Sequence, residues 1–297
     1  MNKILEGTMY KLIAIDLDGT LLNSYGEITP ENKGAIQYAL NKGVNVILAS
    51  GRDPQTMKKM SLDLGINNYL IAGNGASIYD IQQDKNIYEN YISKSKALQV
   101  IKMCKENSIF FNVYTEQGII TESLNYNVKV FNSENTHKSN EKQTNIEVVK
   151  DLYEYVESMD MNILKIIICD SSKIIFNNII QKLKKINGIE VLDVEHMSRK
   201  MIKIGTEEIE IEYFYTEATN RDVNKWDAIE YLIEKMHILP GEVICIGDNM
   251  NDKKMVEHAG VGIAMEHSAL ASQKIGDDIT KSNNENGVAE AIYRYIE

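Results

Sequence analysis

Cysteine is scarce in this chain. The 297 residues contain three, Cys104, Cys169 and Cys245. Their odd number and wide spacing give neither a CxxC pair nor the spacing of a metal site. Cys169 and Cys245 lie within apolar runs, which favours buried free thiols. Because a chain without a disulfide framework is typical of a reducing compartment, we expect a cytoplasmic protein.

Basic charge and long apolar runs are also lacking. The chain has 32 Lys and Arg against 43 Asp and Glu, a formal net charge of -11. This argues against nucleic-acid binding, which needs basic patches, but a bound cation can still attract a small anionic substrate. No segment approaches the roughly 18 apolar residues of a membrane span, and the start, MNKILEGTMYK, lacks the apolar stretch of a secretory signal. We expect no nucleic-acid or membrane partner, and a monomer or weak homo-oligomer.

Strand and helix patterns alternate in both terminal parts of the chain. Apolar runs predict strands at 12–15, 44–49, 69–72, 243–247, 261–264 and near 279. Amphipathic segments predict helices at 31–42, 55–64, 225–236, 252–258, from 268, and 287–295. Thr29 and Pro30 suit the start of the first helix. Such alternation is typical of a parallel sheet covered by helices on both faces.

The middle of the chain has a different pattern. Period-2 strand patterns at 109–115 and 163–169 lie among helical patterns at 95–107 and 174–185, and the polar stretch 132–145 predicts an exposed loop. Neither His137 nor His196 is expected to be a ligand. We therefore predict a doubly wound, mostly parallel α/β core formed by residues 1–84 and 211–297. An α+β domain, residues 85–210, is expected to be inserted into it.

Four short polar stretches fall at the ends of predicted strands or just before a helix. They are DLDGT (16–20), ASGR (49–52), NKWDA around Lys225 and GDNMND (247–252). Each alone has a structural interpretation: Asp18 and Gly19 form turns, Ser50 caps helices, and Lys225 is solvated. Ligands of open α/β sheets, however, bind outside the carboxyl ends of the strands. The four stretches together therefore predict one site.

The residue types in these stretches suit phosphoryl transfer. Hard oxygen ligands for Mg²⁺ are available from Asp16, Asp18, Asp248 and Asp252. Donors for a phosphate are available from Lys225, the Ser50 hydroxyl and the backbone at Gly51. A carboxylate can attack phosphorus and become an aspartyl phosphate. A second carboxyl group two residues on lies on the same side of an extended segment, where it can protonate the leaving oxygen and then activate water.

These motifs resemble those of the haloacid dehalogenase superfamily of phosphatases. Its DxDGT motif, its strand-ending Ser or Thr, its Lys and its GDxxND motif match, in order, 16–20, Ser50, Lys225 and 247–252. The segments NGA (74–76), GVGIAM (260–265) and TKSNNENGVAEAI (280–292) match as well. The inserted segment is similar in position and length to the α/β cap of the Cof-type, or type IIB, sugar-phosphatase branch. The resemblance implies a Rossmann-like core with a cap domain.

The resemblance also implies a role for each motif residue. Asp16 would be the nucleophile and Asp18 the general acid and base. Mg²⁺ would be held by Asp16, the main-chain carbonyl of Asp18, Asp248 and Asp252, the last as a ligand or as a group that orients the others. Phosphate would contact Ser50, Gly51, Lys225 and Asn251, with Arg52 and Asn74 as possible substrate contacts. The substrate would be a small phosphorylated metabolite, such as a sugar phosphate or a phosphorylated cofactor, selected by the cap.

The chain departs from the family pattern at three places. Trp226 stands where the family usually has Gly, Glu266 and His267 replace a common Gly-Asn, and an acidic stretch at 216–222 precedes Lys225. These departures bear on the substrate rather than on the reaction. Three alternatives remain: a phosphomutase with the same aspartyl phosphate, a receiver-type phosphoacceptor domain, and an inactive binding protein. The receiver would lack both Asp18 and the insertion, and the inactive protein would have lost a key carboxylate.

Overall fold

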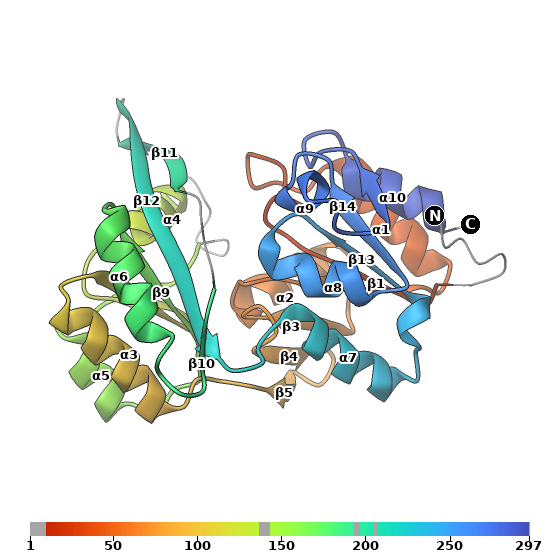
Figure 1. Ribbon diagram of the computed structural model, residues 1–297. Helices are drawn as coiled ribbons and strands as arrows, with labels where there is room; N and C mark the ends of the chain where they lie inside the picture. Colours follow the sequence, from red (N-terminus) through yellow and green to blue (C-terminus); the bar gives the residue numbers. More distant parts are fainter. Residues whose placement is uncertain (1–9, 137–142, 193–196, 205–206, 297) are drawn as a thin grey trace. The chain divides into compact units, whose positions relative to one another are not determined.

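The computed structural model describes residues 10–136, 143–192, 197–204 and 207–296, which form two units (Figure 1). The first unit contains the chain up to Glu89 and from Asn224 onward, and the second is Asn90–Val223. These boundaries differ from the expected 84/85 and 210/211. The reason is that β5 (Lys85–Glu89) pairs with β4 (Ser77–Asp80), whereas β12 (Glu207–Asn220) pairs with β9 (Ile163–Asp170).

The first unit is built on an eight-stranded sheet in the order β15-β14-β13-β1-β2-β3-β4-β5. The strands from β15 to β3 pair in parallel, and β4 and β5 pair antiparallel. The parallel strands are β1 (Leu12–Ile15), β2 (Asn45–Ala49), β3 (Tyr69–Ala72), β13 (Val243–Gly247), β14 (Val261–Met265) and β15 (Asp278–Thr280). The predicted doubly wound, mostly parallel core is confirmed, and β4 and β5 are additions that the apolar runs did not indicate.

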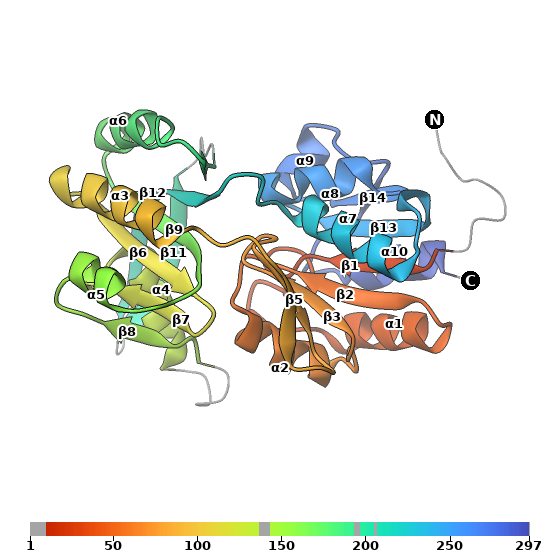
Figure 2. The ribbon, with the colours of Figure 1, turned by 90° about the horizontal axis from the view of Figure 1, so that it is seen from below.

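Helices cover both faces of this sheet (Figure 2). One face carries α1 (Pro30–Asn41), α2 (Pro54–Asp63) and α10 (Gly287–Tyr295); the other carries α7 (Lys225–Met236), α8 (Lys253–His258) and α9 (Ala269–Ser272). Successive residues of β1 point to opposite faces, so Ile13 packs in one apolar cluster and Leu12 in the other. Thr29 caps α1 as predicted, because its hydroxyl accepts from the Asn32 N–H at 3.2 Å. Short 3-10 helices, Pro240–Glu242 and Met250–Asp252, precede β13 and α8.

The second unit has its own sheet, in the order β10-β12-β9-β6-β7-β8, with β11 paired to β12. Its remaining strands are β6 (Phe110–Thr115), β7 (Gly118–Thr121), β8 (Ile146–Val148), β10 (Ile189–Val191) and β11 (Ser198–Ile204). One face packs against α3 (Lys94–Glu106), α5 (Leu152–Ser158) and α6 (Lys173–Leu183), and aromatic residues of the other face pack with α4 (Tyr126–Asn135). The prediction of a loop at 132–145 is wrong for its first residues, because they form the last turn of α4. His137 and His196 lie outside the described residues.

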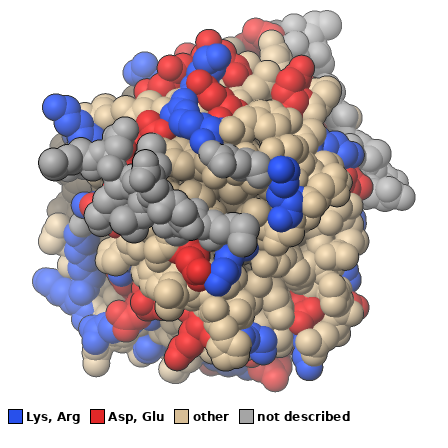
Figure 3. All heavy atoms as spheres, turned by 90° about the vertical axis from the view of Figure 1, so that its right-hand side faces the viewer, with Lys and Arg blue, Asp and Glu red and all other residues tan. Residues whose placement is uncertain are grey.

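The surface carries charges of both signs. On the face shown in Figure 3, Lys and Arg side chains lie among Asp and Glu side chains, and its described residues form no continuous basic patch. Among the described residues, no helix combines the length and the apolar character required to cross a membrane.

Asn32 ties α1 to the segment that follows β1 and to the start of α10. Its fully buried side chain accepts from the Ala289 N–H at 2.9 Å and lies 3.5 Å from the Leu21 carbonyl oxygen. We predict that Asn32→Ala lowers the free energy of unfolding by about 2 kcal/mol, because it leaves a buried N–H without its acceptor. Urea denaturation measures this change. Asn41→Ala, at the exposed end of the same helix, should stay within about 0.5 kcal/mol of wild type, and an equal loss in both variants would contradict the prediction.

Candidate active site

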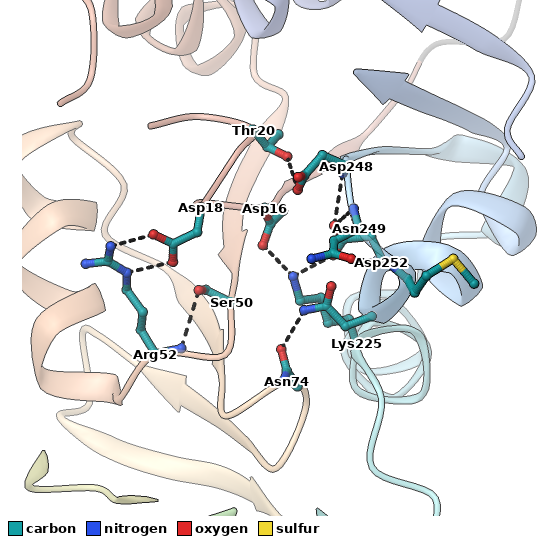
Figure 4. Close-up of polar contacts among 12 residues, drawn as sticks. Asp16, Asp18, Thr20, Ser50, Arg52, Asn74, Lys225, Asp248, Asn249 and Asp252 are labelled. Carbon is teal, nitrogen blue, oxygen red and sulfur yellow. Dashed lines mark hydrogen bonds and ion pairs between the residues drawn. The ribbon is translucent and has the colours of Figure 1, made fainter. Parts of the chain in front are cut away.

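Three neighbouring strands end in the residues that the sequence singled out. Asp16, Ser50 and Asp248 directly follow β1, β2 and β13, which are adjacent in the sheet. The Asp16 N–H donates to the Ile246 carbonyl at 3.0 Å, which continues the β1–β13 ladder by one residue. Parallel strands present their carboxyl ends at one edge, so these side chains meet there (Figure 4).

Lys225 reaches the same edge from the start of α7. Asn224 caps this helix, its side chain accepting from the Asp227 N–H at 3.0 Å. The turn at 73–76 packs directly against the cap: a Cβ on Gly75 would lie 2.1 Å from the Asn224 carbonyl oxygen, and the φ of Gly75 is +103°. Glycine is therefore required at 75, and the NGA segment seats the helix that carries Lys225.

The Lys225 ammonium lies between two carboxylates. Its Nζ is 2.5 Å from Asp16 Oδ1 and 2.6 Å from Asp252 Oδ1, and Lys225 is fully buried. Burial opposes the charged form, but the carboxylates of Asp16 and Asp252 raise the pKa of Lys225 above its ordinary value. The two carboxylates therefore favour the charged ammonium, and the solvated-lysine interpretation is wrong because Lys225 is fully buried.

Asp252 and Asp248 are joined through the loop between them. Asp252 Oδ2 accepts from the N–H groups of Asp248 at 3.0 Å and Asn249 at 3.1 Å. The Thr20 hydroxyl donates to Asp248 Oδ1 at 3.2 Å. A Cβ on Gly19, where φ is +90°, would lie 2.3 Å from Asp248 Oδ2. Gly19 thus provides more than a turn, because it leaves room for the Asp248 carboxylate.

Carboxylate oxygens of Asp16, Asp248 and Asp252 lie within 4.8 Å of one another. Burial and the Asp252 carboxylate raise the pKa of Asp16 well above its usual range, with Lys225 opposing. Burial and the same Asp252 carboxylate raise the pKa of Asp248 to about 7. Three carboxylates against one ammonium leave an excess of negative charge, which is the condition that a divalent cation would relieve. The Asp18 carboxylate is not in this cluster; it points toward Arg52 (Figure 4).

The predicted phosphate and substrate contacts line the other side of the site. Ser50 is buried, and its hydroxyl accepts from the Arg52 N–H at 3.3 Å, with Gly51 in the bend between them. The Asn74 N–H donates to the Ser50 carbonyl at 2.9 Å. Asn74 Oδ1 accepts from Asn251 Nδ2 at 3.0 Å, and among the described residues the buried Asn251 Oδ1 has no partner. The structure thus brings every predicted site residue to one edge of one unit.

Sequence reasoning missed the role of Thr20, which was assigned only to the turn. Its place in the DGT stretch, two residues after Asp18, was the available signal, and in the structure its hydroxyl lies beside Asp248. Glu266 and His267 are exposed, and Glu266 accepts from the Ser282 N–H at 3.1 Å, which tethers two loops. Trp226 is buried and stacks on His258 with ring centroids 5.6 Å apart, so it joins α7 to α8.

Comparisons with known proteins identify the family of this chain. Residues 13–292 match the model of the haloacid dehalogenase-like hydrolases. Phosphatase YwpJ of Bacillus subtilis is 28% identical over 95% of this chain and 98% of its own. The B. subtilis 5-amino-6-(5-phospho-D-ribitylamino)uracil phosphatase YcsE is 27% identical over 98% of both chains. A haloacid dehalogenase-like hydrolase from Bacteroides thetaiotaomicron superposes with a TM-score of 0.78, at 26% identity over 96% of this chain and 99% of that one.

The chain therefore belongs to the haloacid dehalogenase-like hydrolase family, as a phosphatase of its Cof-type branch. The resemblance predicted from the four motifs is confirmed. The enzyme class is that of a phosphoric monoester hydrolase, so a receiver domain and an inactive binding protein are both set aside.

The raised pKa of Asp248 predicts how stability depends on pH in the absence of metal. The folded state binds this proton more tightly than the unfolded chain does, so the stabilisation is complete below about pH 4 and is lost as pH rises through about 7. Asp248→Asn removes this titration. We predict that the stability of wild type relative to Asp248→Asn falls by on the order of 2 kcal/mol between pH 4.5 and 7.5. Urea denaturation in EDTA measures it.

Asp84→Asn is the matched control. Lys58 and Tyr79 lower the pKa of Asp84. The stabilisation that Asp84 contributes is therefore complete above the ordinary pKa of an aspartate, and the stability difference between wild type and Asp84→Asn should stay constant over the same pH interval. A wild-type stability that rises with pH relative to Asp248→Asn would contradict the assignment.

Proposed function

We propose that the protein is a Mg²⁺-dependent phosphatase of small phosphorylated metabolites that works through an aspartyl phosphate on Asp16. One observation carries the proposal: a buried carboxylate, fixed by the Lys225 ammonium, lies among two further carboxylates at the carboxyl edge of the sheet. The same edge holds neutral donors at Ser50 and Asn251. Hard oxygen ligands beside phosphate donors are the combination that metal-assisted phosphoryl transfer requires.

The donor set fits Mg²⁺. Asp16 and Asp248 would hold the ion together with the main-chain carbonyl of Asp18. Both Asp252 oxygens already accept hydrogen bonds, from Lys225 and from two backbone N–H groups, so we assign Asp252 to orienting the others. Bound there, Mg²⁺ would screen the repulsion between the Asp16 carboxylate and an incoming phosphate.

In the first half-reaction, an Asp16 carboxylate oxygen attacks phosphorus and the bond from phosphorus to the ester oxygen breaks. Lys225 holds the nucleophile in one orientation through its bond to Oδ1. The protonated Asp18 carboxyl group gives its proton to the leaving alkoxide. Ser50, Gly51, Lys225 and Asn251 contribute donors for the phosphoryl oxygens.

In the second half-reaction, the Asp18 carboxylate accepts a proton from water while the water oxygen attacks phosphorus. The bond between phosphorus and Asp16 breaks, which releases phosphate and restores both carboxyl groups to their starting states. Asp18 therefore handles one proton in each direction, and this requires its carboxyl group to reach both the leaving oxygen and the attacking water.

The substrate is proposed by class. One relative is named as a phosphatase of a phosphorylated ribitylaminouracil. Sugar phosphates, phosphorylated polyols and phosphorylated cofactor precursors are therefore the first compounds to test. The second unit is the proposed cap that selects among them.

Phosphate release from a panel of these compounds tests the proposal. We predict Mg²⁺-dependent release that EDTA abolishes and that added Mg²⁺ restores. Asp16→Asn should remove turnover entirely, since the nucleophile is lost, and Asp18→Asn should lower kcat by about 10²- to 10⁴-fold. Asp63→Asn, at the exposed end of α2, is the control and should match wild type. Undiminished release by Asp16→Asn would refute the nucleophile assignment.

A phosphomutase would use the same aspartyl phosphate and return the phosphoryl group to the sugar. The two activities separate in the products of the same panel. Hydrolysis yields free phosphate in equal amount to the alcohol, whereas a mutase yields an isomeric sugar phosphate with little free phosphate.

A further inference from the structure

The proposed general acid is held by a neighbour. Arg52 donates to both carboxylate oxygens of Asp18, from Nε at 2.9 Å and from Nη2 at 2.6 Å (Figure 4). This is the parallel two-bond arrangement that a guanidinium forms with a planar carboxylate and equally with two oxygens of a phosphate. Asp18 is therefore bound to a guanidinium group that could equally bind an anionic substrate.

The Asp18–Arg52 ion pair is much more exposed to solvent than the ion pairs of Lys225. The Asp18 side chain is 59% exposed and that of Arg52 is 26% exposed, whereas the Lys225 side chain is fully buried. An exposed ion pair is weak and exchanges readily, while a buried one persists. The Arg52 backbone is fixed, because its N–H donates to the Ser50 hydroxyl. The Asp18–Arg52 pair can therefore open by rotation of the two side chains while the Arg52 backbone stays in place.

We propose that Arg52 is an anion-binding residue of this site and that the Asp18 carboxylate takes the place of the substrate anion when none is bound. A phosphate that binds Arg52 displaces Asp18, and the freed carboxyl group can then turn toward the leaving oxygen. Binding of the substrate and release of the Asp18 carboxyl group are therefore coupled through the Arg52 guanidinium. This inference rests on the proposed function, in which Asp18 must reach the reacting oxygens.

A double-mutant cycle with inorganic phosphate as the probe tests the competition. The dissociation constant of phosphate is measured by calorimetry at pH 7 in excess MgCl₂ for wild type, Asp18→Asn, Arg52→Gln and the double variant. An amide cannot form the two-bond ion pair, so Asp18→Asn leaves Arg52 available. We expect it to tighten phosphate binding by about three- to tenfold when Arg52 is present and by under about twofold with Arg52→Gln.

Each other result overturns the proposal. Equal tightening in both backgrounds would mean that Asp18→Asn acts only by removing a negative charge. No tightening, or unchanged phosphate affinity in Arg52→Gln, would mean that Arg52 does not bind the anion. Glu27→Gln removes an exposed charge from the same unit and should leave phosphate affinity unchanged.

The activity panel separates this inference from the proposed function. A phosphatase that releases phosphate with Mg²⁺ but shows no coupling in the cycle would overturn the competition alone. Absence of turnover on every ester would overturn the proposed function, whatever the cycle gives.

Discussion

The Lys225 ammonium between Asp16 and Asp252 is the interaction on which the rest of the site depends. A fully buried cation persists only with paired carboxylates, and removal of one partner leaves an uncompensated charge in the interior. The three side chains come from the end of β1, the start of α7 and the loop after β13. One cation therefore fixes three segments that are distant in sequence, and one of its two partners is the proposed nucleophile.

The constraint extends outward through Asp252. Its second oxygen accepts the N–H groups that begin the loop of Asp248, so the position of Lys225 also determines where that carboxylate lies. Two glycines allow this arrangement because they have no side chain. Gly19 leaves room for the Asp248 carboxylate, and Gly75 leaves room for the cap of α7. Much of the DxDGT and NGA motifs is thus explained by close backbone approach, before any contact with substrate is considered.

The strands that carry the site were predictable from sequence because they are buried on both faces and read as unbroken apolar runs. Strand β5 is exposed at both ends and half-buried between them, so its residues give no clear pattern. Strand β12 alternates charged and apolar residues, and a boundary at 210/211 cuts it because sequence alone does not show that it pairs along β9. The orientation of Asp18 was also beyond prediction, since it depends on a guanidinium from the segment after β2.

The roles proposed for Asp16 and Asp18, which follow β1, have opposite requirements, and the two side chains form ion pairs of different exposure. The proposed nucleophile, Asp16, must stay in one place, and it is held by the fully buried Lys225 ammonium. The proposed acid, Asp18, would serve first the leaving oxygen and then water, so it must move, and its ion pair with Arg52 is partly exposed and therefore weak. Asp16 continues the strand ladder and is buried with Lys225, whereas Asp18 lies in the turn beyond it and is exposed with Arg52. The two ion pairs therefore differ in the burial of both partners.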